Sequence, residues 1–264
     1  MRDALIAALS RSYGMHAYAK WSGSFWRLIS LVDLGVPRGH PGAVAAADET
    51  LEWVASPRRL AEIHKRRIDG RVRRCGSMEG RSLQACLDVG LRGDPRLDTI
   101  AESLVDTQWP DGGWNCDRRP ECVHSSFNET WGPILGLAKY GATDAATRGA
   151  EFLLQHRVAF SHRTGEPAHP NVMKLHLPAY WHYDLLAGLR TLAISVGLSD
   201  ERATDALDLL EEKRRPDGTW RTEAKWWKRP GSSGSNVDVV DWGPVAHELL
   251  TEQAKGVLAA AGRI

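Results

Sequence analysis

The segment QWPDGGWNC at residues 108–116 returns in altered form as RRPDGTW at residues 214–220. In both copies a Pro-Asp-Gly turn is followed by one further residue and a tryptophan, and these tryptophans are 220 − 114 = 106 residues apart. Similarity at a fixed spacing is typical of repeat proteins, in which one small structural unit packs on the next. The spacing predicts two units of roughly half that length between the turns.

Each unit divides into two helices joined by a short turn, because apolar residues recur there at helical spacing. Helices of the inner type end at a glycine, a common residue just beyond a helix. They are predicted over 24–34, 78–89, 127–140 and 182–196. Outer helices follow over 42–55, 95–108, 144–156 and 200–214, with Asp94 and Ser199–Asp200 as N-caps, and a fifth inner helix covers 244–261.

No stretch alternates apolar and polar residues as strands do, so the sequence predicts an all-α protein of about ten helices in one domain, residues 1–264. Consecutive pairs must bury their apolar faces on one another, which curves the array. The predicted architecture is an α/α toroid, a barrel of about five helical hairpins that closes or remains incomplete. Three long loops, 110–125, 157–181 and 215–241, should gather at one end of it.

The charge balance argues against several classes of protein. With 34 Lys+Arg and 33 Asp+Glu, the net charge of +1 creates no field that would select nucleic acid or an anionic membrane. The basic run 65–74 is interpreted as a solvated helix face and its loop. No apolar run approaches the ~18 residues of a membrane span, and the first residues lack a signal-peptide pattern, so a cytoplasmic protein with reduced cysteines is expected.

The two Trp-containing turns resemble the Gln-Trp repeats of squalene-hopene cyclases and their relatives, in which the indole packs at the end of an outer helix. The stretches DGGWNCDRRPECVHSSFNET (111–130) and LPAYWHYDLLAGLR (177–190) are also similar to actinobacterial proteins labelled prenyltransferase-like or squalene cyclase-like. The resemblance covers residues ~50 to 250 at the level of repeat architecture. It implies the α/α-barrel fold and an isoprenoid substrate.

Two motifs of those families differ here. Class II terpene cyclases protonate an alkene with a DxDD motif, and the nearest string, Asp238-Val-Val-Asp241, has another spacing. Protein prenyltransferases bind zinc through Asp-x-Cys and a distant His, whereas Cys116 follows Trp114-Asn115. The sequence therefore predicts neither polyene protonation by that motif nor a zinc-dependent protein prenyltransferase with a partner subunit.

Acidic residues occupy nearly equivalent positions in the first turns of three inner helices, counted back from the closing glycine of each helix. They are Glu79, Glu129 and Asp184. A favourable interaction with the helix dipole is enough to explain the presence of any single one of these acids. However, the N-termini of inner helices should all point to one mouth, where burial can raise the pKa of a carboxyl group into the acid–base range. We therefore predict proton transfer by His182 and Asp184, with Glu129, His124 and Glu79 as further catalytic candidates.

Aromatic and cationic side chains are predicted to shape the pocket. Ring faces attract a cationic substrate or intermediate, although core packing explains each indole equally well. The predicted binding residues are Trp131, Trp181, Tyr183, Trp242, Arg81 and Cys116. Ser125 or Ser126 is expected to form a capping box with Glu129. Cys116, Cys122 and His124 lack the spacing of a structural zinc site, so neither a metal nor a cofactor is predicted.

The expected function is that of a biosynthetic enzyme of specialised metabolism, cyclase-, lyase- or transferase-like, that performs an acid–base-assisted cyclisation in the barrel cavity. One alternative is a ring-closing substitution that expels an anionic leaving group, received by Arg81, from a non-terpenoid substrate. The other alternative is a non-catalytic helical-repeat binding protein. The expected partner is a small molecule; a protein partner is not indicated.

Overall fold

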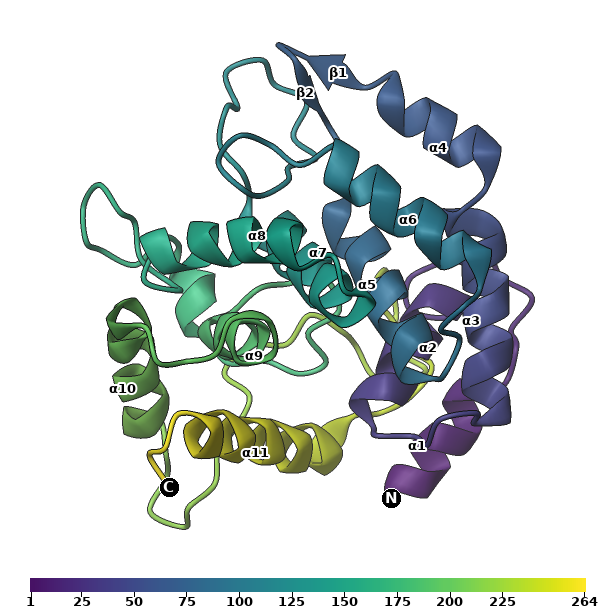
Figure 1. Cartoon of the computed structure of the whole chain (residues 1–264). Helices are drawn as coiled ribbons and strands as arrows, with labels where there is room; N and C mark the ends of the chain where they lie inside the picture. Colours follow the sequence, from purple (N-terminus) through teal and green to yellow (C-terminus); the bar gives the residue numbers. More distant parts are fainter.

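The computed structural model describes all 264 residues, which form eleven α-helices, two 3-10 turns and one small hairpin (Figure 1). The prediction of an all-α protein is confirmed. The helices predicted as inner are α2 (Ser24–Asp33), α5 (Gly76–Asp88), α7 (Phe127–Tyr140), α9 (Leu185–Ser195) and α11 (Gly243–Ala260), and we keep this name for them. The helices predicted as outer are α3 (Pro41–Val54), α6 (Pro95–Asp106), α8 (Thr143–Gln155) and α10 (Thr204–Glu212).

The remaining elements lie at the N-terminal side of the chain and in the loops. They are α1 (Arg2–Leu9), α4 (Pro57–His64), β1 (Arg67–Ile68), β2 (Arg71–Val72), η1 (Pro170–Met173) and η2 (Glu201–Ala203). The strands pair antiparallel, with Arg67 opposite Val72. None of the helices has the length and apolar character that crossing a membrane requires.

The inner helices pack in chain order: α2 contacts α5, α5 contacts α7, α7 contacts α9, and α9 contacts α11. The outer helices lie against them, α3 on α2 and α5, α6 on α5, and α8 on α7 and α9. Side chains from all five inner helices line one shared cavity. The first and last helices are joined by a salt bridge between Arg2 of α1 and Glu252 of α11, 2.9 Å long.

Glycines bring α5 and α7 into backbone contact. A Cβ atom added to Gly80 would lie 2.1 Å from the nitrogen of Pro133, and one added to Gly136 would lie 2.5 Å from the carbonyl oxygen of Gly80. Only glycine allows so close an approach, because it has no side chain. As a result, the N-terminal turns of α5 and α7 lie side by side.

The two repeat turns have the same local structure. The indole of Trp114 donates a hydrogen bond to the carbonyl of Leu104, and that of Trp220 to the carbonyl of Leu210, at 3.1 and 2.7 Å. Each indole thus bonds to a carbonyl in the last turn of an outer helix. In both turns the backbone nitrogen of the tryptophan donates to a threonine hydroxyl of the next inner helix. The repeat inferred from the sequence is therefore a repeat in three dimensions.

Most predicted helix bounds agree with the structure to within a few residues, and the side chains of Asp94 and Asp200 cap helical turns as expected. Three local predictions were wrong. Residues 182–184 precede α9, because Asp184 is its N-cap. The basic run contains the hairpin, and its Arg73 and Arg74 are buried rather than solvated. The capping box is absent, because the side chain of Ser126 does not cap α7 and Ser125 bonds Asp111.

Alanine substitutions at two helical glycines should separate the effect of the close contact from that of helix propensity. Gly80→Ala should lower the free energy of unfolding by at least about 2 kcal/mol, because its methyl group would meet rigid backbone. Gly256→Ala in α11 should raise it by about 0.5–1 kcal/mol, because open space surrounds that glycine and alanine favours helix. Urea denaturation measures both, and equal effects would contradict the proposed role of the contact.

Candidate functional site

The three predicted first-turn acids lie at the N-terminal ends of neighbouring inner helices, and all are buried. Glu79 belongs to α5, Glu129 to α7, and Asp184 immediately precedes α9. Their exposed fractions are 1%, 7% and 2%. Burying a carboxylate requires a compensating partner, so the identity of each partner indicates what each acid can do.

Glu79 is fully engaged by two arginines. Its Oε1 accepts a hydrogen bond from Arg59 at 2.7 Å, and its Oε2 accepts one from Nε of Arg74, also at 2.7 Å. Arg74 in turn donates to the carbonyl oxygen of Ser103 and to the hydroxyl of Thr107 at the end of α6. This network joins the hairpin region to α5 and α6, and it leaves no oxygen of Glu79 free for proton transfer.

Glu129 faces two thiols instead of a base. Its Oε2 accepts hydrogen bonds from the backbone nitrogen and the hydroxyl of Ser77, at 3.0 and 2.8 Å. Its Oε1 lies 3.2 Å from Sγ of Cys116, and Sγ of Cys75 lies within 4.8 Å of both. Burial raises the pKa of Glu129 above its ordinary value. Cys75, Cys116 and Glu129 thus bring three potential ligand atoms together, and this cluster could hold a metal ion.

Asp184 forms a buried pair with His176. Its Oδ1 accepts a hydrogen bond from the nitrogen of Ala187, which caps α9. Its Oδ2 accepts one from the backbone nitrogen of His176 and lies 2.8 Å from Nδ1 of the same residue. Burial lowers the pKa of His176, but the charge of Asp184, the hydrogen bond to it and backbone hydrogen bonds together outweigh burial, so the pKa lies above its ordinary value. An aspartate that holds Nδ1 leaves Nε2 as the reactive nitrogen.

His182, predicted as the partner of Asp184, lies in an aromatic stack. Its ring lies between those of Trp181, at a centroid distance of 3.9 Å, and Trp226, at 4.4 Å. Burial lowers the pKa of His182 to about 3, which keeps its ring neutral near pH 7. The ring of His176 meets this stack edge to face, 5.8 Å from His182 and 6.1 Å from Trp226.

Unpartnered polar atoms gather in this stack. Four buried atoms have no hydrogen-bond partner in the protein: Nε2 of His176, Nδ1 of His182, and Nε1 of Trp181 and of Trp226. Leaving such a group unpaired costs about 1–3 kcal/mol, and native proteins rarely do so. All four atoms lie beside the His176–Asp184 pair. We call these four residues with Asp184 the histidine site.

Of the other predicted indoles, Trp242 belongs to the packing, whereas Trp131 also lines the cavity shared by the inner helices. Trp131 is buried, donates to the backbone oxygen of Trp181 at 3.3 Å, and lies over the guanidinium of Arg81 at 5.1 Å. Trp242 donates to the carboxylate of Asp238, which also accepts a hydrogen bond from Tyr180. The hydroxyl of Tyr183 donates to the carbonyl of Val158. Aromatic side chains therefore fill the space between these helix ends.

The cavity shared by the inner helices lies farther along them and is small and polar. It has a volume of about 200 Å³. Arg81 lines it and is paired with Asp33 at 3.0 Å, while Arg190 lines it beside the paired Asp88 and Lys139. Sites for drug-sized ligands typically measure about 300–1,000 Å³ and are mainly apolar. The cavity is thus smaller and more charged than an isoprenoid chain requires.

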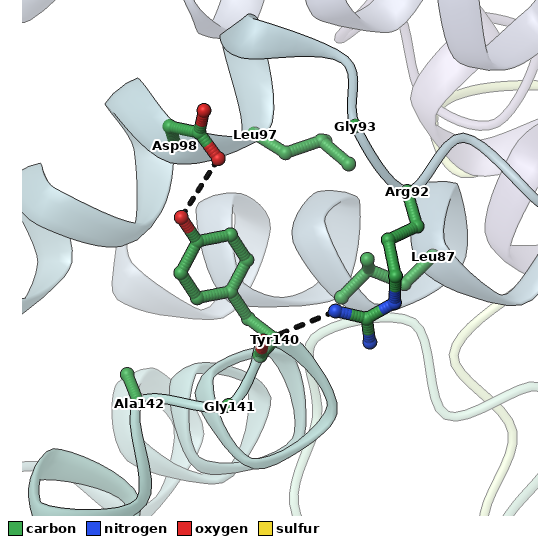
Figure 2. Close-up of a pocket in the computed structure, with 8 residues that line it drawn as sticks. All are labelled: Leu87, Arg92, Gly93, Leu97, Asp98, Tyr140, Gly141 and Ala142. Carbon is green, nitrogen blue, oxygen red and sulfur yellow. Dashed lines mark hydrogen bonds between the residues drawn. The ribbon is translucent and has the colours of Figure 1, made fainter.

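Two further pockets lie away from the histidine site. A hollow of about 330 Å³ lies beside the C-terminal end of α7. Its lining includes Tyr140, which donates to Asp98, and Arg92, which donates to the carbonyl of Tyr140 (Figure 2). It contains none of the predicted site residues. His124 lines another hollow with His156 and is not among the contacts of Glu129.

Sequence reasoning missed His176, Trp226 and the role of Cys75 beside Glu129. His176 and Trp226 lie in long loops that carry no periodic signal, and only the folded chain brings them to Asp184 and His182. The motif LHLPAYWHYD, residues 175–184, does place two histidines just before a helix N-cap. That was the available signal for His176.

No protein-family model matches the chain, and no curated protein matches it either. The fold and the site define a helical-repeat protein that holds a buried His–Asp pair at the N-terminal end of α9.

Neutralising Glu79 should destabilise the protein, because the charge of Arg74, whose side chain is 0% exposed, would lose its buried partner. Glu79→Gln should lower the free energy of unfolding by about 3–5 kcal/mol. Glu121→Gln, at an exposed position, should change it by less than about 0.5 kcal/mol. Urea denaturation of both variants measures this difference, and a stable Glu79→Gln protein would show that the ion pairs are dispensable.

The His176–Asp184 pair should make stability depend on pH. Because the pKa of His176 is raised on folding, its stabilising contribution is full below the unfolded pKa of about 6.5 and is lost as the pH rises through the folded value. The free energy of unfolding of the wild type should therefore exceed that of Asp184→Asn most at pH about 6, and by less at pH about 9. His182→Gln should show a larger gain in stability from pH about 9 to pH about 6 than the wild type, because the lowered pKa of His182 destabilises the folded state as the pH falls below its unfolded value of about 6.5. Parallel pH profiles for wild type and Asp184→Asn would contradict this.

Proposed function

We propose that this protein is an enzyme of small-molecule biosynthesis that uses His176 and Asp184 for acid–base-assisted ring closure on a small, polar, non-terpenoid substrate. The observation that carries the proposal is the 2.8 Å contact between Asp184 and Nδ1 of His176, combined with the unpartnered Nε2 of that ring. Such a pair fixes the imidazole and lets Nε2 accept or return a proton near neutral pH.

The aromatic stack would complete the proposed site. The indole N–H groups of Trp181 and Trp226 are free to donate to oxygen atoms of a substrate. Nδ1 of His182, in a ring that stays neutral, would accept or donate a further hydrogen bond. Lys20 lies 5.5 Å from the ring of Trp181 and supplies a positive charge at the edge of the site. These groups favour a substrate with several polar atoms.

In the proposed reaction, Nε2 of His176 removes a proton from the substrate's own nucleophilic atom. That atom forms a bond to a carbon of the same molecule, and the bond from this carbon to an anionic leaving group breaks. The leaving group departs with the electron pair, and the proton remains on His176, stabilised by Asp184. An isoprenoid cyclisation fits less well, because the central cavity measures only about 200 Å³ and is lined by Arg81, Arg190 and Lys139.

We further propose that the five inner helices form a closed α/α ring. Support comes from their contacts in chain order, from the cavity that all five line, and from the salt bridge between Arg2 and Glu252. A closed ring would hold the N-termini of α5, α7 and α9 at a fixed distance from one another. This rigidity is what proton transfer over a hydrogen-bond distance requires.

The proposal predicts which ligands bind and which variants fail. In a thermal-shift screen, phosphorylated or sulfated amino acids should stabilise the protein more than prenyl diphosphates or polyenes do. With a stabilising compound as substrate, His176→Gln and Asp184→Asn should lower kcat by about 10²–10⁴-fold, the usual contribution of general acid–base catalysis. Product formation is followed by NMR.

His162→Gln serves as the matched control, because His162 is exposed and lies in a different hollow. It should keep wild-type turnover. The assignment of the histidine site fails if His176→Gln, shown to be folded by circular dichroism, turns over at the wild-type rate. The substrate class fails if prenyl diphosphates or polyenes alone stabilise the protein and react.

A further inference from the structure

We propose that Cys75, Cys116 and Glu129 bind a zinc ion, at a site separate from the histidine site. The three residues come from different parts of the chain: Cys75 immediately precedes α5, Cys116 lies in the loop after α6, and Glu129 is in the first turn of α7. Their candidate ligand atoms, two sulfurs and one carboxylate oxygen, all lie within 4.8 Å of one another.

The spacing of these atoms suits a four-coordinate zinc ion. Zinc bound at about 2.3 Å from sulfur and about 2.0–2.2 Å from oxygen holds neighbouring ligand atoms about 3.5–3.8 Å apart in a tetrahedron. The distance between Cys116 Sγ and Glu129 Oε1 is 3.2 Å, and Cys75 Sγ completes the triangle within 4.8 Å. Side-chain movements of up to about 1 Å would bring all three to these values.

The carboxylate is already oriented for such a role. Ser77 donates two hydrogen bonds to Oε2 of Glu129, one from its backbone nitrogen and one from its hydroxyl. The other oxygen, Oε1, therefore points to the sulfur atoms. Metal-binding carboxylates are commonly held by outer hydrogen bonds of this kind, which fix the ligand before the ion binds.

The charge and chemistry of the donors select among cations. Two thiolates and one carboxylate carry three negative charges, and the N-termini of α5 and α7 offset part of the excess. Thiolate ligands favour zinc over magnesium or calcium, which prefer oxygen. Three protein ligands with a fourth position free are typical of a zinc ion that binds water or substrate. Cys116 is exposed, so this side of the proposed site faces solvent.

This site differs from the one that the sequence first suggested. Cys122 and His124 share the loop of Cys116, but the thiol of Cys122 accepts a hydrogen bond from Asn115 and lies 4.0 Å from the carbonyl oxygen of His124. Cys122 is therefore a matched control, a half-buried thiol in the same loop that should not bind the ion.

The test measures the metal content of the untagged full chain, purified with a reductant, loaded with zinc and then freed of loosely bound ions. Mass spectrometry of the metal should find about one zinc per chain. Cys75→Ser, Cys116→Ser and Glu129→Gln should each lose at least about nine-tenths of it, while Cys122→Ser keeps it. Ser77→Ala should weaken zinc binding by about 10–100-fold without removing a ligand.

A spectroscopic readout keeps the test independent of folding defects in the variants. The wild type loaded with cobalt in place of zinc should show thiolate-to-cobalt charge-transfer absorption and the bands of a tetrahedral ion. The proposal is overturned if wild-type protein holds less than about a tenth of an equivalent of zinc, or if Cys116→Ser and Cys122→Ser lose it equally. It is also overturned if intact mass shows a Cys75–Cys116 disulfide that persists with reductant and zinc present.

Discussion

The backbone contact between α5 and α7 is the constraint on which the candidate sites depend. Gly80 and Gly136 let the two helices approach until backbone meets backbone, with Pro133 opposite Gly80. At that separation the first turn of α5 reaches the first turn of α7, so that Ser77 can donate to Glu129. A larger residue at Gly80 would push the helices apart and separate the carboxylate from its donors.

Much of the fold could be predicted from the sequence because its signals are local. Apolar spacing and a closing glycine defined residues 127–140, which form α7, and the two Trp-containing turns revealed the repeat. The hairpin at β1 and β2 could not be predicted, because residues 65–74 around it are rich in arginine, which is typical of a solvent-exposed segment. Arg74 is buried there only because Glu79, on the next helix, offsets its charge.

The sequence predicted where the acidic residues of the candidate site lie, but it did not predict which side chains pair with them. The register of Glu79, Glu129 and Asp184 follows from the repeat, and the structure places all three at neighbouring helix ends. Their partners come from loops whose course depends on tertiary packing. His176 reaches Asp184 in this way, whereas His182, closer in sequence, is held between two indoles.

One repeated position has therefore acquired three different environments. Arginines neutralise the acid on α5, thiols face the acid on α7, and an imidazole pairs with the acid before α9. The surroundings of Glu129 and those of Asp184 are in contact through Trp131. This residue lies two positions after Glu129, and its indole donates a hydrogen bond to the backbone oxygen of Trp181. A shift of α7 would move both the carboxylate and the aromatic stack, because Trp131 and Glu129 lie on the same helical turn. The proposed metal site and the proposed proton-transfer site, although chemically separate, are thus mechanically connected through one helix.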